Sequence, residues 1–188
     1  MPRKTRSSRA QKPSSRTTRK PHKTDVRRTL SPQLKFALKR ILVPIDFSEH
    51  SKNALKYAVP FAKQFGAEII LVYVVEPTVY PADFSFGQFG FPNVEDEFRS
   101  RGEEQLSALI EKEIRKEVKA RKLVLTGKAF IEIIKTAREE EVDLIIIATH
   151  GHSGVEHMLF GSTAEKVVRK APCPVLSLRP DERDFVMP

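Results

Sequence analysis

The sequence has little that would stabilise a protein outside the cell or hold it in a membrane. Its 188 residues include one cysteine, Cys173, so no internal disulfide can form. Because stable disulfides belong to oxidising compartments, their absence favours a reducing one, and we expect a cytoplasmic location. A membrane-spanning helix needs roughly 18 apolar residues in a row, whereas the longest apolar runs here, residues 69–75 and 144–148, are only long enough for strands.

Acidic side chains are almost missing from the first 40 residues. This segment has 14 Lys and Arg against a single acid, Asp25, whereas the rest of the chain has 19 basic and 23 acidic residues. The net charge of +9 therefore comes from the N-terminus. Residues 1–28 also offer almost nothing to bury, so they cannot offset the entropy cost of ordering. We expect a disordered basic tail over residues 1–39, one folded domain over residues 40–180 and a short C-terminal tail over residues 181–188.

The basic tail has two main interpretations. In the first, it is a solvated extension, or even the product of a start codon placed too far upstream. In the second, it binds nucleic acid or another polyanion. Dense Lys and Arg give such affinity without sequence specificity, because binding releases counterions. A transit peptide ranks last, since residues 1–28 lack the apolar periodicity that such peptides need.

Strand-sized apolar runs alternate with helical patterns through the expected domain. The strands are expected at residues 41–43, 69–75, 120–126, 143–148 and 175–178, and the helices at 48–65, 94–116, 131–141 and 162–169. We expect Ser48 to be an N-cap, Pro60 to kink its helix or remove a hydrogen bond, and Phe98 to face the core. The alternation predicts an α/β fold with a parallel sheet. Such sheets bind ligands at the carboxyl ends of their strands, where the strand order reverses.

The loop after the fourth expected strand combines glycines with hydroxyls. Gly151 and Gly161 allow backbone N–H groups to approach an anion closely, and Ser162 and Thr163 then start a helix. A helix N-terminus favours phosphate, although a glycine turn followed by an N-cap is an equal alternative. No Lys follows Gly161, so this is not a Walker loop. The loop over residues 44–49 has no glycine, which excludes a dinucleotide fingerprint.

Three segments carry a family resemblance: residues 41–48 (ILVPIDFS), 161–167 (GSTAEKV) and 171–176 (APCPVL). Through them, and nearly end to end over residues 40–180, the chain resembles a universal stress protein (UspA) domain. They are similar to that family's first strand and acidic turn and to its last helix and strand. The resemblance implies a Rossmann-like, adenine-nucleotide alpha hydrolase-like sheet of five parallel strands in the order 3-2-1-4-5, with helices on both faces. It also implies a role in stress adaptation or signalling.

The glycine pattern of that family's ATP-binding subgroup is partly filled. The subgroup carries Gly-x2-Gly-x9-Gly followed by Ser or Thr, and Gly151 and Gly161 lie in register with the second and third glycines. Ala148 stands at the first glycine, and His152 stands where the family often has a basic residue. Histidine is mostly neutral at neutral pH, so it supplies less charge than Arg. We expect ATP or a related nucleotide, with or without Mg²⁺, to bind more weakly than in a member with every position filled.

The resemblance also implies which residues bind the nucleotide. Asp46 faces the adenosine, the backbone of Val74 after the second strand contacts the base, and positions 151 and 161–163 hold the phosphates. For Asp46 the alternative is a turn or helix-cap acid, and for Val74 it is plain core packing. The full expected binding set is Pro44, Ile45, Asp46, Val74, Ile147, Ala148, Gly151, His152, Gly161, Ser162 and Thr163.

No catalytic residue is assigned, because the sequence offers no evident nucleophile–base pair or acid–base dyad. Slow ATP hydrolysis or self-phosphorylation stays open. His150, His152 and His157 lack an acid or Cys at ligand spacing, so we expect no metal site, and Cys173 is expected to be a buried structural thiol. An aromatic loop either covers the ligand cleft or packs on the domain surface; its residues are Tyr80, Phe84, Phe86, Phe89 and Phe91.

Three other functions are alternatives to nucleotide binding in stress adaptation, and the resemblance also bears on the oligomeric state. An ATP pyrophosphatase-type synthetase needs a Ser-Gly-Gly loop after the first strand, where this chain has Asp46 and Phe47 before its serine. A nucleotide-free interaction module of the same fold, and a nucleic-acid-associated protein acting through the tail, are the other two. The resemblance also implies a homodimer, in which two copies pair the apolar edge of the fifth strand, Val175, Leu176 and Leu178, across a two-fold axis.

Overall fold

The computed structural model describes residues 37–77, 94–114, 117–151 and 161–179. The chain divides into two units, Met1–Lys35 and Phe36–Pro188, and all the described residues lie in the second. The expectations for residues 1–36, for the aromatic residues between positions 80 and 91, and for residues 181–188 lie outside the described ranges. In the described part of the chain, no helix is long and apolar enough to cross a membrane.

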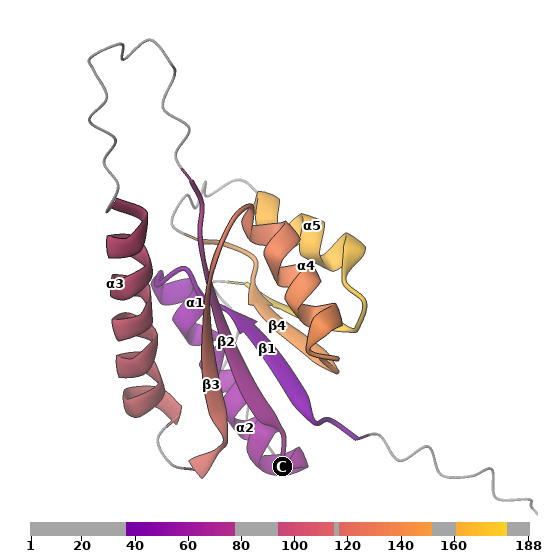
Figure 1. Cartoon of the computed structure of the whole chain (residues 1–188). Helices are drawn as coiled ribbons and strands as arrows, with labels where there is room; N and C mark the ends of the chain where they lie inside the picture. Colours follow the sequence, from indigo (N-terminus) through magenta and orange to yellow (C-terminus); the bar gives the residue numbers. More distant parts are fainter. Residues whose placement is uncertain (1–36, 78–93, 115–116, 152–160, 180–188) are drawn as a thin grey trace, which may run out of the picture. The chain divides into compact units, whose positions relative to one another are not determined.

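Five parallel strands form one sheet in the order β3-β2-β1-β4-β5, which confirms the expected fold class (Figure 1). The strands are β1 Arg40–Pro44, β2 Glu68–Val75, β3 Ala120–Thr126, β4 Leu144–Ala148 and β5 Val175–Leu178. The central strands are apolar on both faces, and Ile41, Leu42 and Val43 of β1 have no exposed surface. A strand of this kind needs cover on both sides, as the strands of parallel sheets have.

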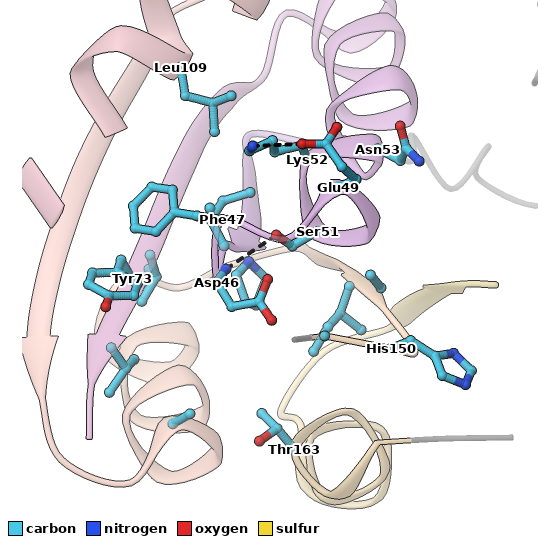
Figure 2. Close-up of a pocket in the computed structure, with 18 of the residues that line it drawn as sticks. Asp46, Phe47, Glu49, Ser51, Lys52, Asn53, Tyr73, Leu109, His150 and Thr163 are labelled. Carbon is cyan, nitrogen blue, oxygen red and sulfur yellow. Dashed lines mark hydrogen bonds and ion pairs between the residues drawn. The ribbon is translucent and has the colours of Figure 1, made fainter. Parts of the chain in front are cut away.

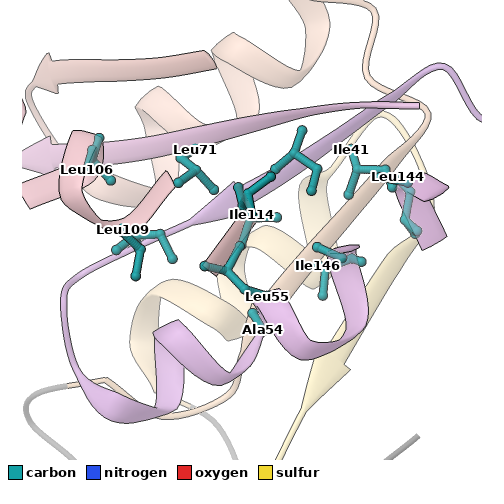
Figure 3. Close-up of a cluster of buried hydrophobic side chains, with 14 of the residues drawn as sticks. Ile41, Ala54, Leu55, Leu71, Leu106, Leu109, Ile114, Leu144 and Ile146 are labelled. Atoms are coloured by element: carbon teal, nitrogen blue, oxygen red, sulfur yellow. The ribbon is translucent and has the colours of Figure 1, made fainter. Parts of the chain in front are cut away.

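Helices cover the sheet on both faces. They are α1 Glu49–Asn53, α2 Leu55–Phe65, α3 Val94–Leu109, the π-helical turn η1 Ile110–Ile114, α4 Ala129–Glu139 and α5 Ser162–Lys170. Side chains of α2, α3 and η1 share a core with one face of the sheet, where Figure 3 shows Leu55 beside Ile146 and Leu106 beside Leu71. Side chains of α4 and α5, such as Ile133 and Val167, form a second core with the other face.

The helices confirm some of the expected local features and contradict others. Ser48 caps α1, as expected, because its Oγ accepts a hydrogen bond of 3.1 Å from the amide three residues on. The first expected helix breaks at Ala54, whereas Pro60 lies inside α2 and removes one helical hydrogen bond without ending the helix. Phe98 is 46% exposed, so its expected place on the buried face is wrong. The core contact of α3 is made two turns later, where Leu106 is fully buried.

The fold includes the last residues of the segment that was expected to be a tail. Leu38 is 3% exposed and belongs to the core on the α2/α3 face. The amides of Lys39 and Arg40 donate hydrogen bonds of 2.7 and 3.0 Å to the Asp143 carboxylate, and Lys39 O accepts from the amide of Glu68 at 2.8 Å. These bonds tie the start of the domain to the amino ends of β2 and β4.

The chain leaves β1 and β4 toward opposite faces of the sheet. After β1 it enters α1 and α2, and α5, the helix that follows β4, packs on the other face. β1 also ends early, since Pro44 pairs with Val72 while β2 continues to Val75. A crevice therefore opens at the carboxyl edge between β1 and β4, which is the usual position of a ligand in such folds.

Candidate functional site

A cleft of about 1320 Å³ occupies this edge of the sheet (Figure 2). The ends of β1, β2 and β4 form its floor, with α1 and α3 on one side and α4 and the start of α5 on the other. Ten of the eleven expected binding residues line it: Pro44, Ile45, Asp46, Val74, Ile147, Ala148, Gly151, Gly161, Ser162 and Thr163. The eleventh, His152, lies outside the described residues.

Asp46 follows β1 and points its carboxylate into the cleft (Figure 2). Its Oδ1 accepts hydrogen bonds from the amide and the Oγ of Ser48, at 3.0 and 2.5 Å, and its own amide donates to Ser51 Oγ at 3.3 Å. Asp46 is therefore a turn acid, as the alternative interpretation has it, and it also lines the cleft. Ser48 and Ser51 are both buried, so these bonds hold the carboxylate in one orientation.

The turn after β1 depends on a left-handed backbone conformation at Phe47. Its φ of 65° lies in a region that bulky residues rarely adopt. The ring of Phe47 contacts the ring of Tyr73 on β2, with centroids 4.7 Å apart. Tyr73 in turn lies against Gly102 of α3, where a Cβ would come within 2.6 Å of Tyr73 Cδ1. Phe47 and Tyr73 line the cleft and Gly102 supports them from α3. Sequence reasoning did not assign these residues to the site, and a turn without glycine gives no sign of the left-handed position at Phe47.

Val74 lies inside β2, so its description as following the strand is wrong, whereas the expected strand over residues 69–75 correctly includes it. Its backbone nevertheless faces the cleft. Val72 O accepts a hydrogen bond of 2.8 Å from the amide of Ile45, and residues two apart on a strand direct their polar backbone groups to the same neighbour. The amide and carbonyl of Val74 therefore face the β1 side, where β1 has already ended. Its side chain packs with the α4/α5 core, so the core-packing alternative also applies.

The last residue of β4 and the residue after it are both small and buried. Ala148 is 8% exposed and Thr149 is 1% exposed. Thr149 is tied to β5, because its amide and its Oγ1 both donate to Leu178 O, at 2.8 and 3.0 Å. That bond uses the hydroxyl proton, so the 3.0 Å contact of Thr149 Oγ1 with His150 Nδ1 requires a proton on this ring nitrogen. The His150 ring lies at the rim, with its centroid 6.4 Å from that of His50.

Gly151 and Gly161 have different neighbours. A Cβ on Gly151 would overlap Asp46 Oδ2, so the loop after β4 meets the carboxylate with bare backbone. Gly161 donates its amide to Thr149 O at 2.7 Å, and a Cβ there would lie 3.1 Å from the same oxygen. The Gly161 amide, one of the donors expected for phosphate, is therefore already paired within the protein.

The first turn of α5 presents open amides to the cleft. The first hydrogen bond inside this helix runs from Glu165 N to Gly161 O at 3.0 Å. The amides of Ser162, Thr163 and Ala164 precede that bond, and within the described residues no side chain caps the helix. All three residues line the cleft. Amides and a dipole directed at one space favour an anion there.

The α1 side of the cleft carries charged side chains, whereas the thiol of Cys173 lies outside the cleft. Glu49 and Lys52 form an exposed ion pair at 2.9 Å, and the hydrogen bond from Lys52 holds the pKa of the Glu49 carboxyl below its usual value. Cys173 does not line the cleft; it is half-buried, and burial raises the pKa of its thiol. Among the described residues, no group of three or more His, Cys, Asp or Glu can hold a metal ion, while His152 and His157 lie outside them.

Comparison with known proteins identifies the family. The model of the universal stress protein family matches residues 37–179. The chain belongs to this family. Universal stress protein MJ0531 of Methanocaldococcus jannaschii is 32% identical over 149 residues, which cover 78% of this chain and 85% of that protein. Universal stress protein MJ0577 of the same organism is 33% identical over 153 residues, which cover 75% of this chain and 94% of that protein.

Solved structures of the universal stress protein family share the fold. The structure of MJ0577 aligns with a TM-score of 0.67 at 28% identity, over 78% of this chain and 99% of that one. A universal stress protein in complex with cAMP aligns at 0.54 and 17% identity, over 76% and 98% of the two chains. One from Archaeoglobus fulgidus in complex with dAMP aligns at 0.52 and 21% identity, over 74% and 96%.

Proposed function

We propose that this universal stress protein binds ATP or a related adenine nucleotide in the cleft at the carboxyl edge of its sheet and acts in stress adaptation or signalling. One observation carries the proposal: three kinds of ligand-binding group face the same cleft. They are the Asp46 carboxylate, the backbone of Val74 where β2 extends past the end of β1, and the N-terminus of α5. Two proteins of this fold hold cAMP and dAMP, but at 17% and 21% identity they share only the fold with this chain. Support for nucleotide binding therefore comes from the residues of this cleft, and support for the stress role comes from family membership alone.

The nucleoside part of the ligand would bind at the ends of β1 and β2. Asp46 Oδ2 accepts hydrogen bonds, which suits ribose hydroxyls. The amide and carbonyl of Val74 form a donor–acceptor pair facing the space beyond β1, which suits the matching pair on an adenine edge. Ile133 of α4 and Ile147 of β4 belong to the core of the α4/α5 face and line the same cleft, so they supply apolar surface for a base.

The phosphates would bind at the start of α5. The open amides of Ser162, Thr163 and Ala164 and the hydroxyls of the first two are donors, and the helix dipole adds to their effect. The Gly161 amide does not take part, since it is bonded to Thr149 O at 2.7 Å. Among the described residues this end has no Lys or Arg in the cleft lining, which supports modest affinity.

The described part of the cleft offers few carboxylates that could coordinate a Mg²⁺ ion bound together with ATP. The carboxylates that line it are those of Asp46, Glu49, Glu76 and Glu113, and none of them lies on α5. Glu49 is paired with Lys52, and Glu76 accepts a hydrogen bond of 2.8 Å from the amide of Ala129. The protein residues therefore do not fit a dedicated magnesium site, and phosphate oxygens and water would have to supply its ligands. We expect removal of Mg²⁺ to change the Kd for ATP by less than about tenfold, or 1.4 kcal/mol.

Calorimetric titration of the full chain with ATP, ADP, AMP and adenosine tests the proposal. Asp46→Ala should weaken all four ligands, because it removes a charged acceptor worth about 1.5–3 kcal/mol. Gly161→Val should weaken ATP most, because its side chain projects beside Thr149 O and the first turn of α5. Glu139→Ala is the matched control, since it removes an exposed acid at the far end of α4. No heat with millimolar ATP would move the protein to the class of nucleotide-free interaction modules, and equal binding by Gly161→Val would mean that the phosphate site is misplaced.

A further inference from the structure

Gly151 and Asp46 meet across the cleft, although they follow different strands. A Cβ on Gly151 would overlap Asp46 Oδ2 and lie 3.4 Å from its Cγ. Non-bonded carbon atoms in proteins prefer separations of about 3.5–4.0 Å, so the distance to Cγ is already tight and the distance to Oδ2 is not possible without a shift. The backbone of the loop after β4 therefore lies directly on the carboxylate, and only a glycine leaves room for it.

The Asp46 carboxylate is not free to move away from a larger residue. Its Oδ1 accepts from the amide and the Oγ of Ser48, at 3.0 and 2.5 Å. Its backbone is held on one side by the 3.3 Å bond to Ser51 Oγ, and on the other by Phe47, whose ring is packed on Tyr73. A shift of the carboxylate away from Gly151 therefore strains the two bonds from Ser48, and the backbone contacts keep Asp46 as a whole from moving with it.

We propose that Gly151 is a positioning residue for Asp46, so that it controls recognition of the nucleoside and not of the phosphates. The inference rests on the proposed nucleotide function, and it differs from the phosphate role that the glycine pattern suggests. The amides that suit phosphate are those of Ser162, Thr163 and Ala164, whereas the close contact of Gly151 is with the carboxylate that suits ribose. A methyl group at position 151 acts on the ligand by displacing Asp46.

Thermal unfolding of the full chain tests the contact without any ligand. The proteins compared are the wild type, Gly151→Ala, Asp46→Ala and the double variant. Gly151→Ala should lower the Tm of the wild type by about 2–4 °C, but should change the Tm of Asp46→Ala by less than about 1 °C, because the clashing carboxylate is gone. Equal losses in both backgrounds would show that the methyl group clashes with something other than Asp46, which overturns the inference.

Calorimetry on the same four proteins tests the role in recognition. Gly151→Ala should weaken adenosine, AMP and ATP by the same factor, about tenfold, and should cause no further loss in the Asp46→Ala background. Gly161→Ala is the matched contrast, since its Cβ would lie 3.1 Å from Thr149 O beside the first turn of α5. Its loss should grow from adenosine to ATP.

A loss for Gly151→Ala that grows with the number of phosphates, or that persists in full without the Asp46 carboxylate, would assign Gly151 to the phosphates and overturn the inference. A wild type that binds none of the three ligands would refute the proposed function and the recognition role together. The thermal unfolding of the four proteins would still decide whether Gly151 positions Asp46, so the two failures are distinguishable.

Discussion

Gly102→Ala should destabilise this protein, although the same change stabilises most helices. Gly102 is buried in α3, and an added Cβ would lie 2.6 and 2.8 Å from Cδ1 and Cε1 of Tyr73. Relief of the overlap needs a shift of about 1 Å, given the usual carbon–carbon separation of about 3.5–4.0 Å. The Tyr73 ring cannot simply retreat, because the Phe47 ring lies against it with centroids 4.7 Å apart.

Two opposing effects set the size of the change. Overpacking of a well-packed site costs about 1–3 kcal/mol. Replacing Gly by Ala inside a helix contributes about 1 kcal/mol of stabilisation. The net loss should be about 0–2 kcal/mol, which for a chain of this size lowers Tm by about 2–4 °C for each kcal/mol. Because the ring that must move also packs on Phe47, next to Asp46, adenosine binding should weaken as well.

Thermal unfolding followed by circular dichroism measures this change, with Tyr73→Ala as the background that isolates the clash. Without the ring, Gly102→Ala should raise Tm, since only the helix-propensity effect of about 1 kcal/mol remains. The sign of the effect should therefore reverse between the two backgrounds. A Gly102→Ala variant that is more stable than the wild type by the full propensity value would refute the steric argument.

Three further predictions concern other parts of the chain. The hydrogen bonds from Arg121, at 2.5 and 3.3 Å, lower the pKa of Glu140 from its ordinary value of 4.5, so the stabilisation is present above that pH and is lost as pH falls through the folded pKa. The wild type should be more stable than Glu140→Gln by about 1 kcal/mol at pH 7 in urea titrations, and the difference should vanish in acid; a constant difference would contradict this. Two copies should pair through β5, so light scattering at micromolar concentration should show a dimer that Leu176→Lys makes monomeric, and a monomeric wild type would refute the pairing. A chain without residues 1–35 should bind DNA or RNA more weakly than the full chain, whose binding should fall steeply with salt, and equal binding by both would exclude the tail.

The sheet is predictable from sequence because its central strands are uninterrupted apolar runs. Ile41, Leu42 and Val43 have no exposed surface, and a run of this kind fits only a strand covered on both faces. The break at Ala54 is not predictable, because alanine favours a continuing helix. Its amide instead bonds to Ser51 O at 3.2 Å, three residues back, and Ser51 is itself held by the turn around Asp46.

The cleft residues are predictable from their register in a motif, but their interactions are not. A pattern shows that a glycine stands at position 151, not that Asp46 lies against it. Gly102 belongs to no pattern, since the side chain that requires it is Tyr73 on another element. The expected strand over residues 69–75 includes Val74, but a sequence does not show that the neighbouring strand stops first: β2 runs on after β1 has ended, and this mismatch makes the Val74 backbone accessible.

Each of three glycines in or near this cleft leaves room for a different group of the protein itself. Gly102 leaves room for the Tyr73 ring and Gly151 for the Asp46 carboxylate. Gly161 leaves room for the carbonyl of Thr149 and also donates its amide to that oxygen. A count of motif glycines is therefore not a count of ligand contacts. Ala148 occupies the first motif position and is accommodated with 8% exposure at the end of β4. Its methyl group therefore changes what a ligand touches at that point, while the positions of Asp46 and of the open α5 amides depend on contacts that Ala148 leaves in place.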